Sequence, residues 1–122
     1  MVTDRTGAPM SMFGGPGTAI AFADAAFAGD PGAGSPTGGL IEYSFAEPRF
    51  WPDSPELRVD PSIHFRHGAG REGLANVCWL DGHVSVQGFH DTWTSGLYGA
   101  DPRDFGIGWF GESGDNRDFG YR

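Results

Sequence analysis

The sequence contains no lysine. All eight basic residues are arginine, against sixteen aspartate and glutamate residues, and the formal net charge is −8 at pH 7. A surface without a basic stripe argues against nucleic-acid binding, because contacts to phosphate dominate that affinity. It argues equally against an anionic membrane surface. An acidic surface suits cations instead, calcium included.

Cysteine is almost absent as well. The single Cys78 excludes an internal disulfide, and without a Cys-x-x-Cys pair a cysteine-based zinc site is excluded too. No run of about 18 apolar residues occurs, so we expect no membrane contact by this chain itself. The first residues are polar and lack the apolar stretch of a signal peptide, so no targeting signal is evident. We expect either a stand-alone domain or a fragment of a longer protein whose targeting signal lies upstream.

Glycine and proline are abundant, with 21 and 9 residues, and aromatic residues make up 14% of the chain. Aromatic side chains bury large areas and can fill a small core between irregular loops. The composition therefore predicts a mainly β fold, with α+β as the alternative: a small antiparallel sheet with long Gly/Pro-rich loops. We expect a flexible N-terminal tail over 1–17, a β-rich head domain over 18–111 and a C-terminal tail over 112–122.

Apolar and alternating runs predict the strands. Residues 18–27 and 39–47 read as two strands, whereas the proline-rich stretch 48–61 must be a loop or an edge crossing. Residues 62–67 alternate, which places Ile63, Phe65 and His67 on one face and Ser62, His64 and Arg66 on the other. From residue 87 onward the chain reads as irregular, pinned by Trp93, Tyr98, Phe105, Trp109 and Phe110.

The clearest local signal is Asp81-Gly82, which lies between two runs of β-forming residues, 75–80 and 83–86. An Asp-Gly pair in this position is a strong hairpin signal, because the glycine accepts the positive φ that the turn needs. We therefore predict a hairpin closed at Gly82.

One group of side chains has the chemistry of a metal site: His64, His67, Asp81 and His83. If strand 62–67 pairs with the hairpin, these residues could bind zinc and support a metal hydrolase. The simpler interpretation, which we favour, is structural: Asp81 favours the turn, and His67 hydrogen-bonds nearby backbone. No nucleophile motif accompanies them, and Cys78 lies in an apolar run typical of a buried thiol. The sequence therefore predicts no catalytic residues and no enzyme.

Two binding interpretations remain open. Acidic residues near the end of the chain could coordinate calcium together with loop carbonyl oxygens, although we favour a solvated acidic surface as the explanation. The candidate calcium ligands are Asp101, Asp104 and Asp115. Aromatic side chains among polar loops could stack on sugars, although core packing explains them too. These aromatic residues are Trp51, Trp93, Tyr98 and Trp109. Apart from calcium, no cofactor is predicted.

The hairpin and the strand before it resemble the C-terminal signature of prepilin-like proteins named for an H-X9-DG pattern. The matching positions, here called the signature residues, are Arg66, His67, Ala75, Asn76, Asp81, Gly82 and His83. Flanking segments at 22–24, 40–43 and 105–111 also resemble that family, so the resemblance covers about 18–111. Thirteen residues, not nine, separate His67 from Asp81. The extra four lie in the loop around 70–73, where an insertion costs little.

The resemblance implies a pilin-like globular head, a structural subunit of a type II secretion or type IV pilus-like system. It implies an extracytoplasmic place, in the cell envelope or at the surface, and other pilin-like subunits or secretion-system components as partners. The signature residues would then be structural, with Asn76 and His67 tying strand and loop ends by hydrogen bonds. The alternative is a small extracytoplasmic module that binds calcium or carbohydrate.

Overall fold

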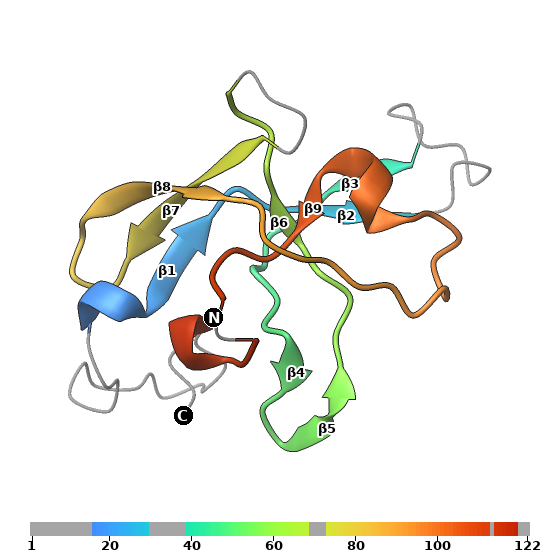
Figure 1. Cartoon of the computed structure of the whole chain (residues 1–122), viewed down its shortest axis with the longest axis horizontal. Helices are drawn as coiled ribbons and strands as arrows, with labels where there is room; N and C mark the ends of the chain where they lie inside the picture. Colours follow the sequence, from blue (N-terminus) through green and yellow to red (C-terminus); the bar gives the residue numbers. More distant parts are fainter. Residues whose placement is uncertain (1–15, 30–38, 69–72, 113, 120–122) are drawn as a thin grey trace.

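The computed structural model describes residues 16–29, 39–68, 73–112 and 114–119. Over these ranges the chain is mainly β, and its strands form small antiparallel sheets, as the composition predicts (Figure 1). Helical structure in this part of the chain is confined to short 3₁₀ turns, and no helix within it has the length and apolar character to cross a membrane. These turns are η2 (Pro16–Thr18), η4 (Pro102–Phe105) and η5 (Arg117–Phe119). Most of the predicted N-terminal tail, 1–15, lies outside the described residues.

The largest sheet has three strands, in the order β1 (Ile20–Ala23), β7 (Leu74–Trp79) and β8 (Val84–Gly88). The predicted hairpin is confirmed as the β7–β8 pair. Its loop has three residues, 80–82, rather than two, because Trp79 donates its N–H to the carbonyl of His83 at 2.9 Å. Gly82 closes the loop with a φ of +92°, the left-handed conformation that this type of hairpin needs.

The predicted single strand over 18–27 is wrong, because it divides at Asp24. β1 pairs with β7, and then the chain turns so that β2 (Ala26–Ala28) pairs with β3 (Leu40–Glu42). At the crossing, the carbonyl of Asp24 accepts the N–H of His64 at 2.9 Å, and Ala26 donates its N–H to the carbonyl of Ser62 at 2.8 Å. One apolar run therefore contributes a strand to each of two sheets, β1 to the three-stranded sheet and β2 to the β2–β3 pair, which lie on opposite sides of the molecule in Figure 1.

The predicted strands over 39–47 and 62–67 are shorter than expected. β3 ends at Glu42, and β6 (Ile63–His64) pairs with β9 (Ile107–Gly108) rather than with the hairpin. Burial does not alternate along 62–67: Ser62 is buried, with its hydroxyl accepting the N–H of Glu47 at 2.8 Å, and His67 is exposed. His67 pairs only with Leu74 in an isolated bridge. Most of the residues inserted in the signature, 70–72, lie outside the described residues.

The proline-rich stretch forms a separate hairpin of β4 (Phe50–Trp51) and β5 (Ser54–Arg58). Its paired positions are Phe50 with Arg58 and Trp51 with Ser54, with an irregular register between them. Pro55 is outside these pairs, so its missing N–H costs no ladder bond. In Figure 1 this hairpin projects away from the three-stranded sheet.

The main core lies on the inner face of the three-stranded sheet, where β7 alternates strictly between exposed or half-buried and buried residues. The core contains the predicted Trp109 and Phe110, whereas Tyr98 is 47% exposed. Its other buried members are Ile20, Ile63, Phe65, Ala75, Val77, Trp79 and Phe119. A smaller cluster of Ala26, Ala28 and Ile107 lies beside it.

Arg49 is buried, with 1% of its surface exposed, and it connects the last part of the chain to the core. Its Nη2 donates to Asp91 Oδ1 at 2.7 Å and to the carbonyls of Phe110 and Gly111 at 3.1 Å each. Its Nη1 donates to the carbonyl of Asp115 at 3.4 Å. Buried charges need such partners, so this arginine fixes where the final segment lies.

Residues 114–119, which the sequence assigns to a C-terminal tail, pack against the body of the domain. Phe119 is 3% exposed within the main core. Asn116 joins this segment to the β4–β5 hairpin, because its side chain donates to the carbonyl of Phe50 at 2.7 Å and accepts the N–H of Phe50 at 3.0 Å. The tail prediction is corrected over these residues.

Candidate functional site

The signature residues divide between the two ends of β7. At the first end, the carboxylate of Asp24 pairs with Nε2 of His67 at 2.9 Å and accepts the N–H of Asn76 at 2.9 Å. Arg66 donates to the carbonyl of Ala25 at 2.9 Å. His67 and Asn76 therefore both interact with the carboxylate of Asp24. Asp24 lies in 22–24, one of the flanking segments that also resemble the prepilin-like family. This arrangement locks the point where the chain leaves β1 for β2.

At the other end of β7, Asp81 accepts the N–H of His83 at 3.0 Å and contacts Nδ1 of the same residue. These hydrogen bonds, the backbone one first, hold the pKa of Asp81 below its usual value. The His83 ring stacks on Trp79, with ring centroids 5.8 Å apart and planes 10° from parallel. The Asp-Gly-His run therefore closes the hairpin and covers one end of the core.

Substitution of Gly82 by valine tests this turn. We expect a loss of about 1–2 kcal/mol in the free energy of unfolding, because a β-branched residue resists positive φ. A Cβ at Gly82 would meet no atom within 4 Å, so the cost comes from the backbone alone. Thermal unfolding measures it. Gly88→Val is the matched control, since Gly88 also faces open space and lies in a strand. An unchanged melting temperature of Gly82→Val would show that the turn assignment is wrong.

The candidate metal ligands are not brought together. His67 pairs with Asp24 at one end of β7, whereas Asp81 and His83 lie at the other end, about 17–20 Å away along a six-residue strand. His64 lies on β6, where burial lowers its pKa. Over the described ranges, no three His, Cys, Asp or Glu side chains converge as metal ligands would.

The candidate calcium ligands have separate structural roles. Asp101 caps η4, because its side chain accepts the N–H of Arg103 at 3.0 Å, and Asp104 donates its N–H to the carbonyl of Asp101. Asp115 forms an ion pair with Arg117 at 2.9 Å, in the segment beside the β4–β5 hairpin. The sequence grouped these aspartates by composition, and the fold divides them between two turns.

The outer face of the three-stranded sheet is largely apolar and exposed over the described residues, with the polar Asn76 among its apolar side chains. We call it the apolar face; it consists of Phe22, Leu74, Cys78, Val84 and Val86. Phe22, Cys78 and Val84 form one row across the three strands, because Phe22 pairs with Cys78 and Cys78 with Val84. Phe22 is 75% exposed, Val84 64% and Val86 56%. Contiguous exposed apolar side chains typically mark a contact surface.

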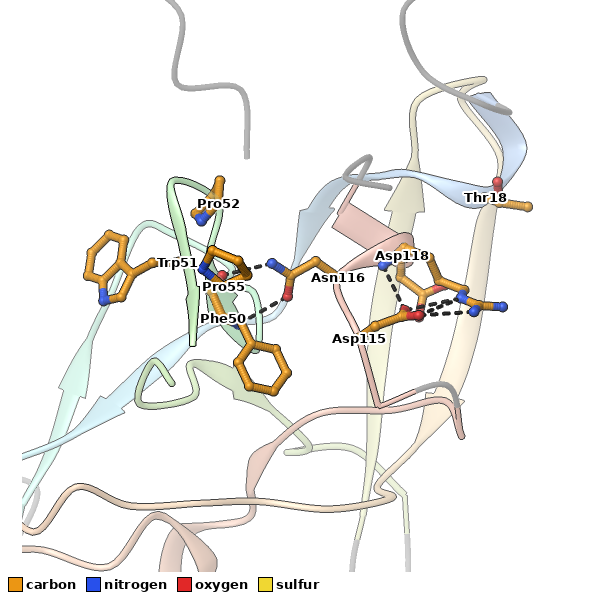
Figure 2. Close-up of a pocket in the computed structure, with 9 residues that line it drawn as sticks. Thr18, Phe50, Trp51, Pro52, Pro55, Asp115, Asn116 and Asp118 are labelled. Atoms are coloured by element: carbon orange, nitrogen blue, oxygen red, sulfur yellow. Dashed lines mark hydrogen bonds and ion pairs between the residues drawn. The ribbon is translucent and has the colours of Figure 1, made fainter. Parts of the chain in front are cut away.

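An open cleft of about 970 Å³ lies between the β4–β5 hairpin and the 115–118 segment (Figure 2). One wall is apolar, made of hairpin side chains, and the other is polar. The apolar wall is Phe50, Trp51, Pro52 and Pro55; the polar wall is Asp115, Asn116, Arg117 and Asp118, with Thr18 at the edge. The sequence singled out Trp51 as a stacking residue. It also singled out Asp115, as a candidate calcium ligand, but it did not place this residue opposite the hairpin, because nothing local links residue 116 to residue 50.

Comparison with known proteins found no family model, curated protein or solved structure that matches this chain.

Proposed function

We propose that this chain is the non-catalytic, pilin-like head of a pseudopilin-like protein, a structural subunit of a type II secretion or type IV pilus-like system. The resemblance over 18–111 suggests the family. The positions of the signature residues agree with a structural role, because they hold the ends of β7 and form no reactive group. The observation that carries the proposal is the apolar face.

The apolar face has the chemistry of a contact between protein subunits. Full burial of a valine or phenylalanine contributes about 1.5–3 kcal/mol, so covering these half-exposed side chains gives several kcal/mol before the cost of association. None of its five residues is charged, in a chain of net charge −8, so a neighbour can cover it without burying a carboxylate. Such a contact is weak between two molecules and becomes strong when it repeats along an assembly. The occupant we propose is a neighbouring pilin-like subunit.

The double substitution Val84→Asp and Val86→Asp tests this role in the cells that make the protein. We expect the wild-type protein in the membrane or sheared-surface fraction, and the double variant largely in the soluble fraction, because two carboxylates would be buried in the contact. An antibody against the chain follows both. The control is Leu57→Asp with Leu97→Asp, which adds the same charge at two exposed leucines outside the apolar face.

Two outcomes would count against the assembly role. One is a 13.0 kDa band confined to the cytosolic fraction of wild-type cells, which would indicate a stand-alone domain. The other is normal fractionation of the double variant, provided that its purified form unfolds at the wild-type temperature. Equal loss of both double variants would indicate sensitivity to charge rather than a contact at the apolar face.

A further inference from the structure

We propose that the cleft between the β4–β5 hairpin and the 115–118 segment binds a neutral, β-linked oligosaccharide of gluco-configured units. The cleft shares no residue with the apolar face. This binding activity is therefore separate from the assembly role and can be tested separately.

The apolar wall offers a stacking platform. Trp51 is 50% exposed at the tip of the hairpin, beside Pro52 and Pro55 (Figure 2). Exposure of an indole ring to water is unfavourable, and a ligand that covers the ring with an apolar surface is therefore bound more tightly. A gluco-configured pyranose places its hydroxyls around the rim and its axial C–H groups on the two faces. Those flat faces match the exposed indole ring of Trp51.

The polar wall offers an acceptor for the sugar hydroxyls. Among the described residues, no hydrogen bond uses the Asp118 carboxylate, although the side chain is half-buried. Burial raises its pKa above the usual value. The charges of Arg49 and Arg117 act on this carboxylate, but no hydrogen bond from the described residues satisfies it, so hydroxyl groups of a ligand could donate to it. This observation is independent of the exposed tryptophan on the opposite wall.

The two walls are held in place before any ligand arrives. Asn116 bonds both backbone polar groups of Phe50, and Arg49 holds the carbonyl of Asp115 from below. A site fixed in this way loses little conformational entropy on binding. Its volume lies within the range of small-molecule sites, about 300–1,000 Å³.

The charge of the cleft favours a neutral ligand. Asp115 and Asp118 stand against one arginine in the lining, and Arg117 already donates two of its nitrogens to Asp115 at 2.9–3.2 Å. An anionic ligand would therefore meet excess negative charge, because the one arginine in the lining is already paired with Asp115. Sugar hydroxyls both donate and accept, so they suit a wall of this composition.

Calorimetric titration of the full chain with cellohexaose and chitohexaose tests the proposal. We expect binding of at least one of these straight β-1,4-linked chains, and weaker binding of maltohexaose, whose α-linkages curve the chain. Trp51→Ala should reduce the affinity at least tenfold, since stacking on an indole is lost. Asp118→Ala should reduce it severalfold, because an acceptor is lost. Tyr98→Ala, an exposed aromatic outside the cleft, should leave the affinity unchanged.

Three results would overturn the proposal. No heat with either β-linked hexasaccharide at millimolar concentration would remove the ligand class. Undiminished affinity of a folded Trp51→Ala variant would remove the site. Binding of a proline decamer at the cleft, with no sugar binding, would show that the aromatic and proline wall recognises extended peptides instead. Each result leaves the fractionation experiment on the apolar face unaffected.

Discussion

Replacement of Arg49 by methionine is expected to reduce the free energy of unfolding by about 2–4 kcal/mol, because it removes a buried arginine that pairs with the partly exposed Asp91 and donates to two backbone carbonyls. Methionine fills much of the volume but donates no hydrogen bond. Asp91 and the carbonyls of Phe110 and Gly111 would lose their donor, and the guanidinium 5.4 Å from the Trp109 ring centroid would be gone. Arg58→Met is the matched control, because that guanidinium lies at the surface over Phe50 and Trp93 and contributes about 0.5–1 kcal/mol.

The pH dependence of the Arg49 effect follows from Asp91. Burial opposes its charge, but hydrogen bonds from Arg49 and His90 dominate and hold the pKa of Asp91 below its usual value of 3.8. A carboxyl group with a lowered folded pKa stabilises the fold above its unfolded pKa, and that stabilisation is lost as pH falls through the folded pKa. The difference in the free energy of unfolding between wild type and Arg49→Met should therefore be largest at pH 6 and decrease below about pH 4.

Urea unfolding followed by tryptophan fluorescence, at a series of pH values, measures both effects. A loss below about 1 kcal/mol for Arg49→Met, equal to that of Arg58→Met, would contradict the central role of Arg49. A difference that grows on acidification would contradict the assignment to Asp91.

The second large effect is expected at Trp109. Its ring is fully buried in the main core, and its Nε1 donates to the carbonyl of Glu47 at 3.0 Å. Trp109→Ala should cost about 3–5 kcal/mol for the cavity, and more for the buried carbonyl that loses its donor. In a domain of ordinary stability, about 5–15 kcal/mol, this is a large fraction of the total.

Differential scanning calorimetry measures the Trp109 effect. We expect a melting temperature lower by at least about 10 °C, or no cooperative transition at all. Trp51→Ala makes the same change at an exposed site and should shift the transition by only a few degrees. Similar melting temperatures for the two variants would show that Trp109 is not the centre of the core.

Local signals predicted the local parts of this fold. Asp81-Gly82 indicated the hairpin because turn geometry depends on adjacent residues, and Trp109 and Phe110 were expected in the core because large aromatic residues fill it. The division of the 18–27 run at Asp24 could not be predicted, because both sides of the break are equally apolar. The break depends on bonds from His67 and Asn76, which are distant in the sequence.

The same limit applies to the candidate sites. An arginine in a proline-rich stretch is expected at the surface, and only partners 42 to 66 residues away make Arg49 a buried one. Trp51 could be named from the sequence as a stacking residue, but its opposite wall depends on Asn116, which is 66 residues after Phe50. The sequence predicts side-chain chemistry well, and it does not predict which distant residues meet.

The burial of Phe119 has a consequence for how the protein is made. Ile20 and Phe119 belong to one core, so that core is incomplete until residues near 119 have left the ribosome. At ordinary elongation rates of about 5–20 residues per second, the earlier strands wait on the order of 5–20 s for their last partners. β1 completes its sheet only when β8 ends at Gly88, and the buried face of that sheet waits further for Phe119. We therefore expect folding to follow synthesis, and the nascent chain to depend on chaperones that bind apolar segments.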